Sequence, residues 1–499
     1  MAHIVFPFDN SYARDLPGFY APCPPATVDS PTLLFLNRSL AEELGLDLAH
    51  QDDTALAALF SGNRLPQGAQ PIAQAYAGHQ FGQFSPQLGD GRALLIGEVI
   101  DVHGQRRDIA FKGSGRTPFS RRGDGKAAVG PMLREVLLGE AMHALGIPTT
   151  RALAVVATGE PVYRERVLPG AILTRVAASH LRVGTFQYFM AHGSPHQVRQ
   201  LADYAMARHF PRTRQAENPY LAFLGAVAER QAALIALWMH VGFIHGVMNT
   251  DNMAIPGETI DYGPCAFMET FDPAAVFSSI DGQGRYAYAE QPRIARWNLA
   301  RLAECLLPLI DTGEGHAITL ATEVIDAFPE RYRQHWLAGL RAKLGLADTG
   351  SHGDGMDAAL GEGWLDLLHA QQVDYTLAWR HLADAAAGDE TPLRALFPGQ
   401  PGLERWLQRW RERCASEDVG NDRAAARAQA MRQVNPWIIP RNQRVEEALE
   451  AASDHGDLKP FESLLHALRR PYDTDPALAV YAQPAGTDFM AEFRTYCGT

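Results

Sequence analysis

The chain has 499 residues, of which 46% are hydrophobic and 20% are charged, and its formal net charge at pH 7 is −12. A chain of this length can bury a large core and is expected to divide into two or three domains or lobes. The negative net charge argues against a general nucleic-acid-binding protein, which is usually basic. Residues 105–126 are locally basic; such a segment is usually a solvated surface and less often a pocket for a phosphorylated ligand.

The cysteines and the apolar segments indicate the cellular compartment. The five cysteines are scattered and form no C-x-x-C pair, which argues against a disulfide framework or a structural zinc site and favours the reduced cytosol. The N-terminus lacks the pattern of a signal peptide, and no apolar run reaches the ~18 residues that span a bilayer. We therefore expect a soluble cytoplasmic protein without a membrane or nucleic-acid partner.

Residues 1–80 are rich in proline, with one short helical pattern near 37–60, and are expected to form an N-terminal extension that packs on the rest of the chain. A glycine-rich turn then leads into a β-like run at 93–100, and a second strand is predicted over 107–114. The two strands read as a hairpin, with Lys112 near the end of the second strand.

A helix is predicted over 131–148, because Pro131 suits a first helical turn and a Gly and a Pro close the segment. Two further strands are predicted near 152–157 and 170–176. Strands, one helix and more strands are the order found in the small lobe of a protein-kinase-like fold, which residues 81–180 would form.

The remainder of the chain is predicted to be mainly helical. Residues 222–243 are long and apolar, as in a helix buried in a core, and they belong to a larger lobe at 181–345. Residues 346–363 are rich in Gly and Asp and are predicted to be a linker or an exposed loop. A helical extension with several tryptophans would complete residues 346–499. The expected class is therefore α+β, with a bilobal, kinase-like architecture and an extension at each end.

The most informative motif is "HGVMNTDN" at residues 245–252, followed by "IDYG". Protein kinases carry a catalytic loop H-x-D-x-x-x-x-N and then a metal-binding D-F-G. His245 and Asn252 have that spacing, and Asp261 begins a D-Y-G that matches D-F-G. However, Val247 stands where the catalytic Asp of a kinase would be.

Several cations could bind phosphate groups. Lys112 alone would more often be a surface lysine at a strand end, and an inward-facing lysine usually needs a carboxylate partner. Glu135 and Glu140 lie on opposite faces of the predicted helix, so helical geometry does not decide between them. Arg175 ends a strand and Arg182 follows closely; either could be a surface residue, or both could face one cleft.

Two glycine-containing segments could approach a phosphate. "GDGR", at 89–92, offers the backbone N–H groups of Gly89 and Gly91 and the side chain of Arg92. "RRGDGK", at 121–126, is a second such segment. Each could equally be an ordinary turn.

Oxygen ligands for a metal ion follow in the same loop region. Asn252 and Asp261 carry hard oxygen ligands of the kind that Mg²⁺ prefers. Asp251 precedes Asn252 and could act as a general base towards a hydroxyl, although Asp also caps helices and turns.

Long stretches of the chain resemble the selenoprotein O family, which are protein adenylyltransferases with a pseudokinase fold. The resemblance runs from near the N-terminus to about residue 273, and more weakly to the end, and includes the stretches "AGHQFGQFSPQLGDGRA", "DIAFKGSGRTPFSRRGDGKA", "ILTRVAASHLRVGTFQYF", "HGVMNTDNM" and "IDYGPCAFMETFDP". The resemblance implies transfer of AMP, with ATP bound in a flipped orientation relative to kinases. This would explain why the Asp of kinases is not needed at position 247.

The resemblance also implies a role for individual residues. It assigns the general base to Asp251 and the metal ligands to Asn252 and Asp261, with Mg²⁺ or Mn²⁺ as the metal. The remaining implied roles are phosphate binding by Lys112, Arg175 and Arg182, an ion pair between Lys112 and Glu135, and further nucleotide contacts at Gly89, Gly91, Arg92, Asp124, Gly125 and Asp261.

The implied acceptors are Ser, Thr or Tyr hydroxyls of other proteins, with self-modification as a further case. Two rival hypotheses are an atypical protein or small-molecule kinase and a non-catalytic scaffold that binds nucleotide. Near the C-terminus, Cys497 corresponds to the selenocysteine of some family members; a redox role and a free thiol on a mobile tail are equally compatible with the sequence.

Overall fold

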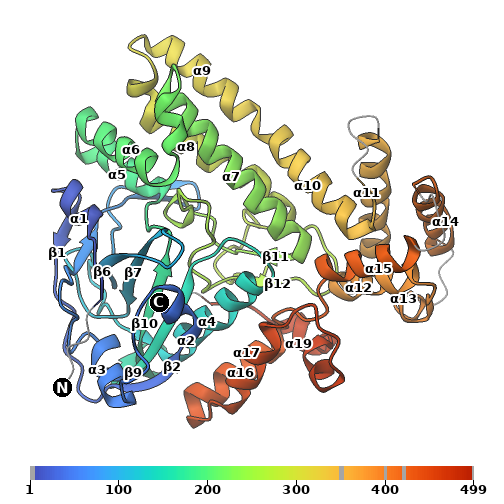
Figure 1. Ribbon diagram of the computed structural model, residues 1–499, viewed down its shortest axis with the longest axis horizontal. Helices are drawn as coiled ribbons and strands as arrows, with labels where there is room; N and C mark the ends of the chain where they lie inside the picture. The colour runs from blue at the N-terminus through green and yellow to red at the C-terminus, as the bar shows by residue number, and fades with distance from the viewer. Residues whose placement is uncertain (1–5, 348–352, 398–401, 418–422, 497–499) are drawn as a thin grey trace.

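The structure is a computed structural model that describes residues 6–347, 353–397, 402–417 and 423–496. It combines one main β-sheet with many helices, so the mixed α and β class is as predicted. The sheet lies in the blue and cyan part of the chain, and the helices of the later residues surround it on two sides (Figure 1). Cys497 lies outside the described residues.

One antiparallel sheet organises residues 20–177. Within the described ranges it has eight strands, in the order β1-β3-β6-β7-β10-β9-β2, with β8 paired to β10. Their bounds are Tyr20–Pro22 (β1), Thr32–Leu36 (β2), Ile72–Gln74 (β3), Ala93–Ile100 (β6), Arg106–Lys112 (β7), Ala127–Ala128 (β8), Arg151–Tyr163 (β9) and Val167–Ala177 (β10). The predicted hairpin is confirmed: β6 pairs with β7, and Ala93 lies opposite Lys112.

The N-terminal segment contributes three strands to the main sheet. Strands β1, β2 and β3 all belong to the main sheet, where β3 pairs with β6 and β2 pairs with β9. The helical pattern near 37–60 forms two separate helices, Arg38–Glu43 (α2) and Asp53–Phe60 (α3). The sequence could not show this, because strands of three to five residues are too short to display a clear alternation.

Helix α4 (Val129–Ala144) replaces the predicted helix at 131–148 with slightly different ends. It packs against β9 and β10, and the C-terminal helices α16 (Asn442–His455) and α17 (Lys459–Leu468) pack against it in turn (Figure 1). Glu140 of α4 forms ion pairs with Arg151 of β9 and with Arg469, just after α17. The C-terminal segment therefore helps to hold α4 in place.

The remaining long helices lie beyond the sheet (Figure 1). Their bounds are Val183–His192 (α5), Pro195–His209 (α6), Pro219–Val241 (α7), Gln291–Ile310 (α8), Glu314–Asp326 (α9), Phe328–Leu344 (α10), Asp354–Ala370 (α11), Tyr375–Ala386 (α12), Gly402–Ala415 (α14) and Arg423–Val434 (α15). The prediction of a linker or exposed loop at 346–363 is wrong from residue 354 on, because helix α11 begins there. This helix packs its apolar side against α10.

Helix α7 corresponds to the long apolar segment predicted at 222–243. Among the described residues it alone has the length and composition of a membrane span, and 56% of its most apolar window is buried. It packs against α8 and α10, as the core helix of a globular protein does, so its apolar character is weak evidence for a membrane.

Candidate functional site

One cavity of about 870 Å³ lies where β7, β10 and α4 face the loop that follows α7. Every site residue predicted from the sequence contributes to its lining. They are Gly89, Gly91, Arg92, Lys112, Asp124, Gly125, Glu135, Arg175, Arg182, Asp251, Asn252 and Asp261. Residues separated by up to 172 positions in the chain therefore share one site.

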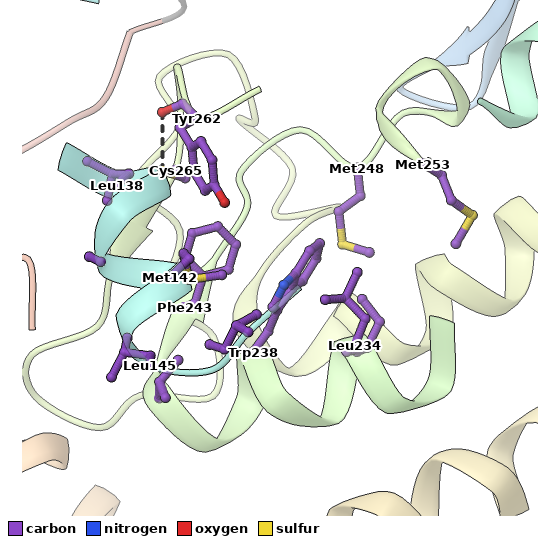
Figure 2. Close-up of a cluster of buried hydrophobic side chains, with 14 of the residues drawn as sticks. Leu138, Met142, Leu145, Leu234, Trp238, Phe243, Met248, Met253, Tyr262 and Cys265 are labelled. Atoms are coloured by element: carbon purple, nitrogen blue, oxygen red, sulfur yellow. Dashed lines mark hydrogen bonds between the residues drawn. The ribbon is translucent and has the colours of Figure 1, made fainter. Parts of the chain in front are cut away.

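The loop that carries the acidic residues is anchored by apolar packing. Helix α7 ends at Gly242, and the short strand β11 (Phe243–Ile244) pairs with β12 (Ala266–Phe267). Figure 2 shows a buried cluster that joins α4, α7 and the loop; the labelled members are Leu138, Met142, Leu145, Leu234, Trp238, Phe243, Met248, Met253, Tyr262 and Cys265. Asp251 and Asn252 lie between the buried residues Met248 and Met253. Asp261 directly precedes the buried Tyr262. Apolar packing therefore fixes the backbone next to each of these polar residues.

Four charged side chains meet at the floor of the cavity. Lys112 Nζ lies 2.6 Å from Glu135 Oε1 and 2.5 Å from Asp261 Oδ1, and Arg175 Nη2 lies 2.9 Å from Glu135 Oε2 and 2.5 Å from Asp261 Oδ1. Burial alone would raise the pKa of Asp261, but the charges of Arg175 and Lys112 outweigh it and hold that pKa well below its usual range. Two cations and two carboxylates thus balance, and both carboxylates are ionised at neutral pH.

The backbone of Asp261 is unusual. Its φ of 65° lies in the left-handed region, which non-glycine residues seldom adopt and which costs of the order of 1–3 kcal/mol when it is strained. Arg182 approaches the same region: its Nη1 lies 3.6 Å from Asp261 Oδ2 and donates a hydrogen bond of 2.9 Å to the backbone oxygen of Asp251. The guanidinium of Arg182 also stacks on the ring of Tyr76.

Asp251 differs from Asp261 in having almost no partners. Its Oδ2 accepts one long hydrogen bond of 3.4 Å from Gln80 Nε2, and its buried Oδ1 has no hydrogen-bond partner in the structure. Burial raises the pKa of Asp251 to about 6, with Arg182 acting in the opposite direction. A buried carboxylate that has few hydrogen bonds and belongs to the lining of a cavity is suited to accept a proton.

The third polar residue of the loop, Asn252, is oriented by the backbone. Its Nδ2 donates to the backbone oxygen of Val247 at 3.0 Å, which leaves Oδ1 as the atom that could bind a ligand. No group of three or more His, Cys, Asp or Glu side chains that could hold a metal ion occurs in the described part of the chain. An Asn amide and an Asp carboxylate would therefore be the main protein ligands of any metal here.

The glycine-containing segments are held in conformations that require glycine. Gly89 has φ of 72°, and a Cβ there would lie 2.3 Å from the ring of Phe119. Gly125 has φ of 71°, and a Cβ would lie 2.1 Å from the carbonyl oxygen of Gly115. The two segments are thereby brought together on one side of the cavity. Asp124 also lines it, but its carboxylate forms an ion pair with Arg164 at 2.7 Å.

The basic segment 105–126 divides into two parts. Lys112, Arg121, Arg122 and Lys126 line the cavity. Arg106, in contrast, forms ion pairs with acidic side chains away from the cavity. The segment is therefore divided between the lining of the cavity and ion pairs elsewhere in the fold, and its binding of a phosphorylated ligand stays a prediction.

Polar residues of the cavity to which the sequence analysis gave no role include Tyr76, Gln80 and Asp90. Asp90 is buried and accepts a hydrogen bond from the backbone N–H of Gln74. The available signals were that Asp90 lies within the GDGR segment at 89–92, and that Gln80 and Asp90 both lie within a stretch that resembles the selenoprotein O family.

Comparison with known proteins agrees with the geometry. The profile of the family described as "Protein adenylyltransferase SelO" matches residues 4–469. A protein nucleotidyltransferase YdiU from Chromobacterium violaceum is 60% identical over 97% of this chain and 100% of its own length, and one from Cereibacter sphaeroides is 60% identical over 99% and 100%. One from Rhizobium johnstonii is 58% identical over 99% of this chain and 98% of its own length. The chain belongs to the SelO family of protein adenylyltransferases.

Proposed function

We propose that this protein transfers AMP from ATP to Ser, Thr or Tyr hydroxyls of proteins and releases pyrophosphate. The observation that carries the proposal is the pairing, in one cavity, of three cations (Lys112, Arg175 and Arg182) with a buried carboxylate, Asp251, whose Oδ2 accepts only one long hydrogen bond. The names of the related nucleotidyltransferases support the same reaction.

The fold proposed for this reaction is bilobal and kinase-like. Residues 81–180 form the smaller lobe and 181–345 the larger one, with the nucleotide between them and with 1–80 and 346–499 as additions. ATP lies flipped relative to kinases, so that its α-phosphorus rather than its γ-phosphorus faces the acceptor. The apolar side chain of Val247 at the position of the kinase base supports this orientation, because it cannot accept a proton.

Each charged residue then has a chemical task. Asp251 accepts the proton of the acceptor hydroxyl as its oxygen attacks the α-phosphorus, and general-base catalysis of this kind typically contributes ~10²–10⁴-fold. Negative charge grows on the leaving pyrophosphate, and Lys112, Arg175 and Arg182 stabilise it electrostatically. Glu135 holds Lys112 and Arg175 in position through the ion pairs described above.

Mg²⁺ or Mn²⁺ fits the oxygen donors at the cavity. Asn252 Oδ1 and the carboxylate of Asp261 would hold the ion, since hard oxygen ligands suit both metals. The bound ion would neutralise phosphate charge and orient the phosphate groups. Because Asp261 already contacts Lys112 and Arg175, an ion at this carboxylate would compete with those contacts.

Two labelled forms of ATP test the proposal. Purified protein is incubated with Mg²⁺, a generic protein acceptor and ATP labelled at the α- or at the γ-phosphorus. Label in protein from the α-position alone, with the added mass of an AMP group, is the expected result. Label from the γ-position alone would instead show an atypical kinase. Binding of ATP without label from either position, in the acceptor or in the enzyme itself, would favour a nucleotide-binding scaffold.

The cytoplasmic location is also proposed, on the basis of the scattered cysteines. Fractionation of cells that express the tagged chain tests it directly. Recovery in the membrane or secreted fraction would contradict it.

A further inference from the structure

A short hairpin lies directly beside the proposed base. Strands β4 (Gly78–Gln80) and β5 (Gln83–Ser85) pair with each other, with Phe81 and Gly82 at the turn. The hairpin is bonded to the catalytic loop, since the backbone N–H of His79 donates to Thr250 Oγ1 at 2.7 Å. Phe81 consequently lines the same cavity as Asp251.

Phe81 is held at the cavity in an unfavourable conformation. Its φ is 50°, in the left-handed region that a bulky residue seldom adopts. Its backbone N–H donates to both Asn249 Oδ1 and the hydroxyl of Tyr286, each at 3.1 Å, and its ring packs on that of Tyr286. The side chain nevertheless remains 36% exposed. Strain of this kind, maintained by surrounding contacts, is typical of residues that bind a ligand.

A second apolar group lies on the rim, from another part of the chain. Ile280 lines the cavity and is 51% exposed. The C-terminal segment supports this part of the chain, because Thr495 pairs in parallel with Ser278 and accepts a hydrogen bond from the backbone N–H of Ser279.

We propose that this rim, formed by Phe81 and Ile280, binds an extended segment of the acceptor protein and selects hydroxyls that have an apolar side chain nearby in the sequence. The inference rests on the proposed function, because it assumes a protein acceptor at Asp251. An attacking hydroxyl must reach the carboxylate of Asp251, so the residues that flank the hydroxyl have to lie against the cavity rim. Exposed apolar side chains gathered at such a site mark a binding surface.

A pair of peptides tests the inference. Each contains a single Ser, flanked by Leu in one peptide and by Asn, of similar size, in the other, and AMP transfer from α-labelled ATP is measured for both. We expect kcat/KM to be about tenfold higher for the Leu peptide. Phe81→Ala and Ile280→Ala should each raise KM for that peptide and reduce the preference to about threefold or less, with the affinity for ATP unchanged.

Val102→Ala is the matched control, because Val102 is also an exposed apolar residue, at 62%, but lies outside the cavity lining. It should retain the tenfold preference. Equal rates for the two peptides in the wild-type protein would overturn the inference, as would an unchanged preference in both rim variants. Labelling of whole proteins but of neither peptide would also overturn it and leave AMP transfer intact, whereas absence of α-label in every acceptor would refute the proposed function itself.

Discussion

Replacing Asp251 by Asn should make the protein more stable and nearly inactive. The carboxylate is buried and its Oδ1 has no partner, so the folded state holds a charge that water would solvate better. The rise in the pKa of Asp251 from 3.8 to about 6 means that the folded state disfavours the ionised carboxylate relative to the protonated form by about 3 kcal/mol. The Asn amide also loses hydration on burial, which reduces the expected gain to about 1–2 kcal/mol.

The sign of the pH dependence follows from the same pKa. The folded-state pKa of Asp251 is raised, so the cost of its ionisation is full above about pH 6, decreases as the pH falls towards the unfolded value near 3.8, and is absent below that value. At pH 5 this cost is about half of its value at pH 7–8, whereas the hydration loss of the Asn amide does not depend on pH. The stability difference between Asp251→Asn and the wild type should therefore be full at pH 7–8 and close to zero at pH 5.

The assay combines thermal unfolding with AMP transfer. We expect the unfolding midpoint of Asp251→Asn to rise by about 1–2 °C at pH 7.5, and turnover to fall ~10²–10⁴-fold with little change in ATP affinity. Asp261→Asn is the contrasting variant: it leaves Lys112 and Arg175 with less compensating charge, and should lower stability by about 3–5 kcal/mol. A lower midpoint for Asp251→Asn, or near-normal turnover, would refute the reasoning.

Three further predictions concern the helix, a buried lysine and a glycine. Glu135→Gln should weaken ATP binding at least about tenfold in a nucleotide titration, because Lys112 loses an ion pair, whereas Glu140→Gln should lower the unfolding midpoint and leave ATP affinity unchanged. Burial lowers the pKa of Lys343 to about 7, and the described residues give this side chain aromatic neighbours but no ion pair. The stability of the wild-type protein should therefore rise with pH between about 7 and 10. Lys343→Met should increase the free energy of unfolding by about 1–3 kcal/mol at pH 7, as measured by chemical denaturation. Gly125→Ala should abolish ATP binding or folding, as judged by nucleotide titration and circular dichroism, because its Cβ would overlap a backbone oxygen; normal ATP affinity in this variant would contradict that geometry.

Much of the site could be predicted from local sequence. The hairpin that presents Lys112, the apolar helix before the loop and the order of Asp251, Asn252 and Asp261 all depend on short-range patterns, and the structure contains each of them. Residue type and spacing were sufficient there, because a strand or a helix fixes the direction of successive side chains.

Tertiary structure decided what those patterns left open. Helical geometry placed Glu135 and Glu140 on opposite faces and could not choose between them; the packing of α4 on the sheet turns Glu135 towards Lys112, while Glu140 meets two arginines from elsewhere in the chain. The short strands of residues 1–80 likewise gain their place only by pairing with distant strands.

The contrast between the two aspartates shows the same limit most clearly. Sequence identifies Asp251 and Asp261 as acidic residues of one loop region, whereas their opposite pKa shifts arise from burial and from cations on β7 and β10. The chain's local pattern determines which groups are available, and long-range packing determines their partners and hence their charge, because electrostatic energies depend on distances in space rather than on separation in sequence.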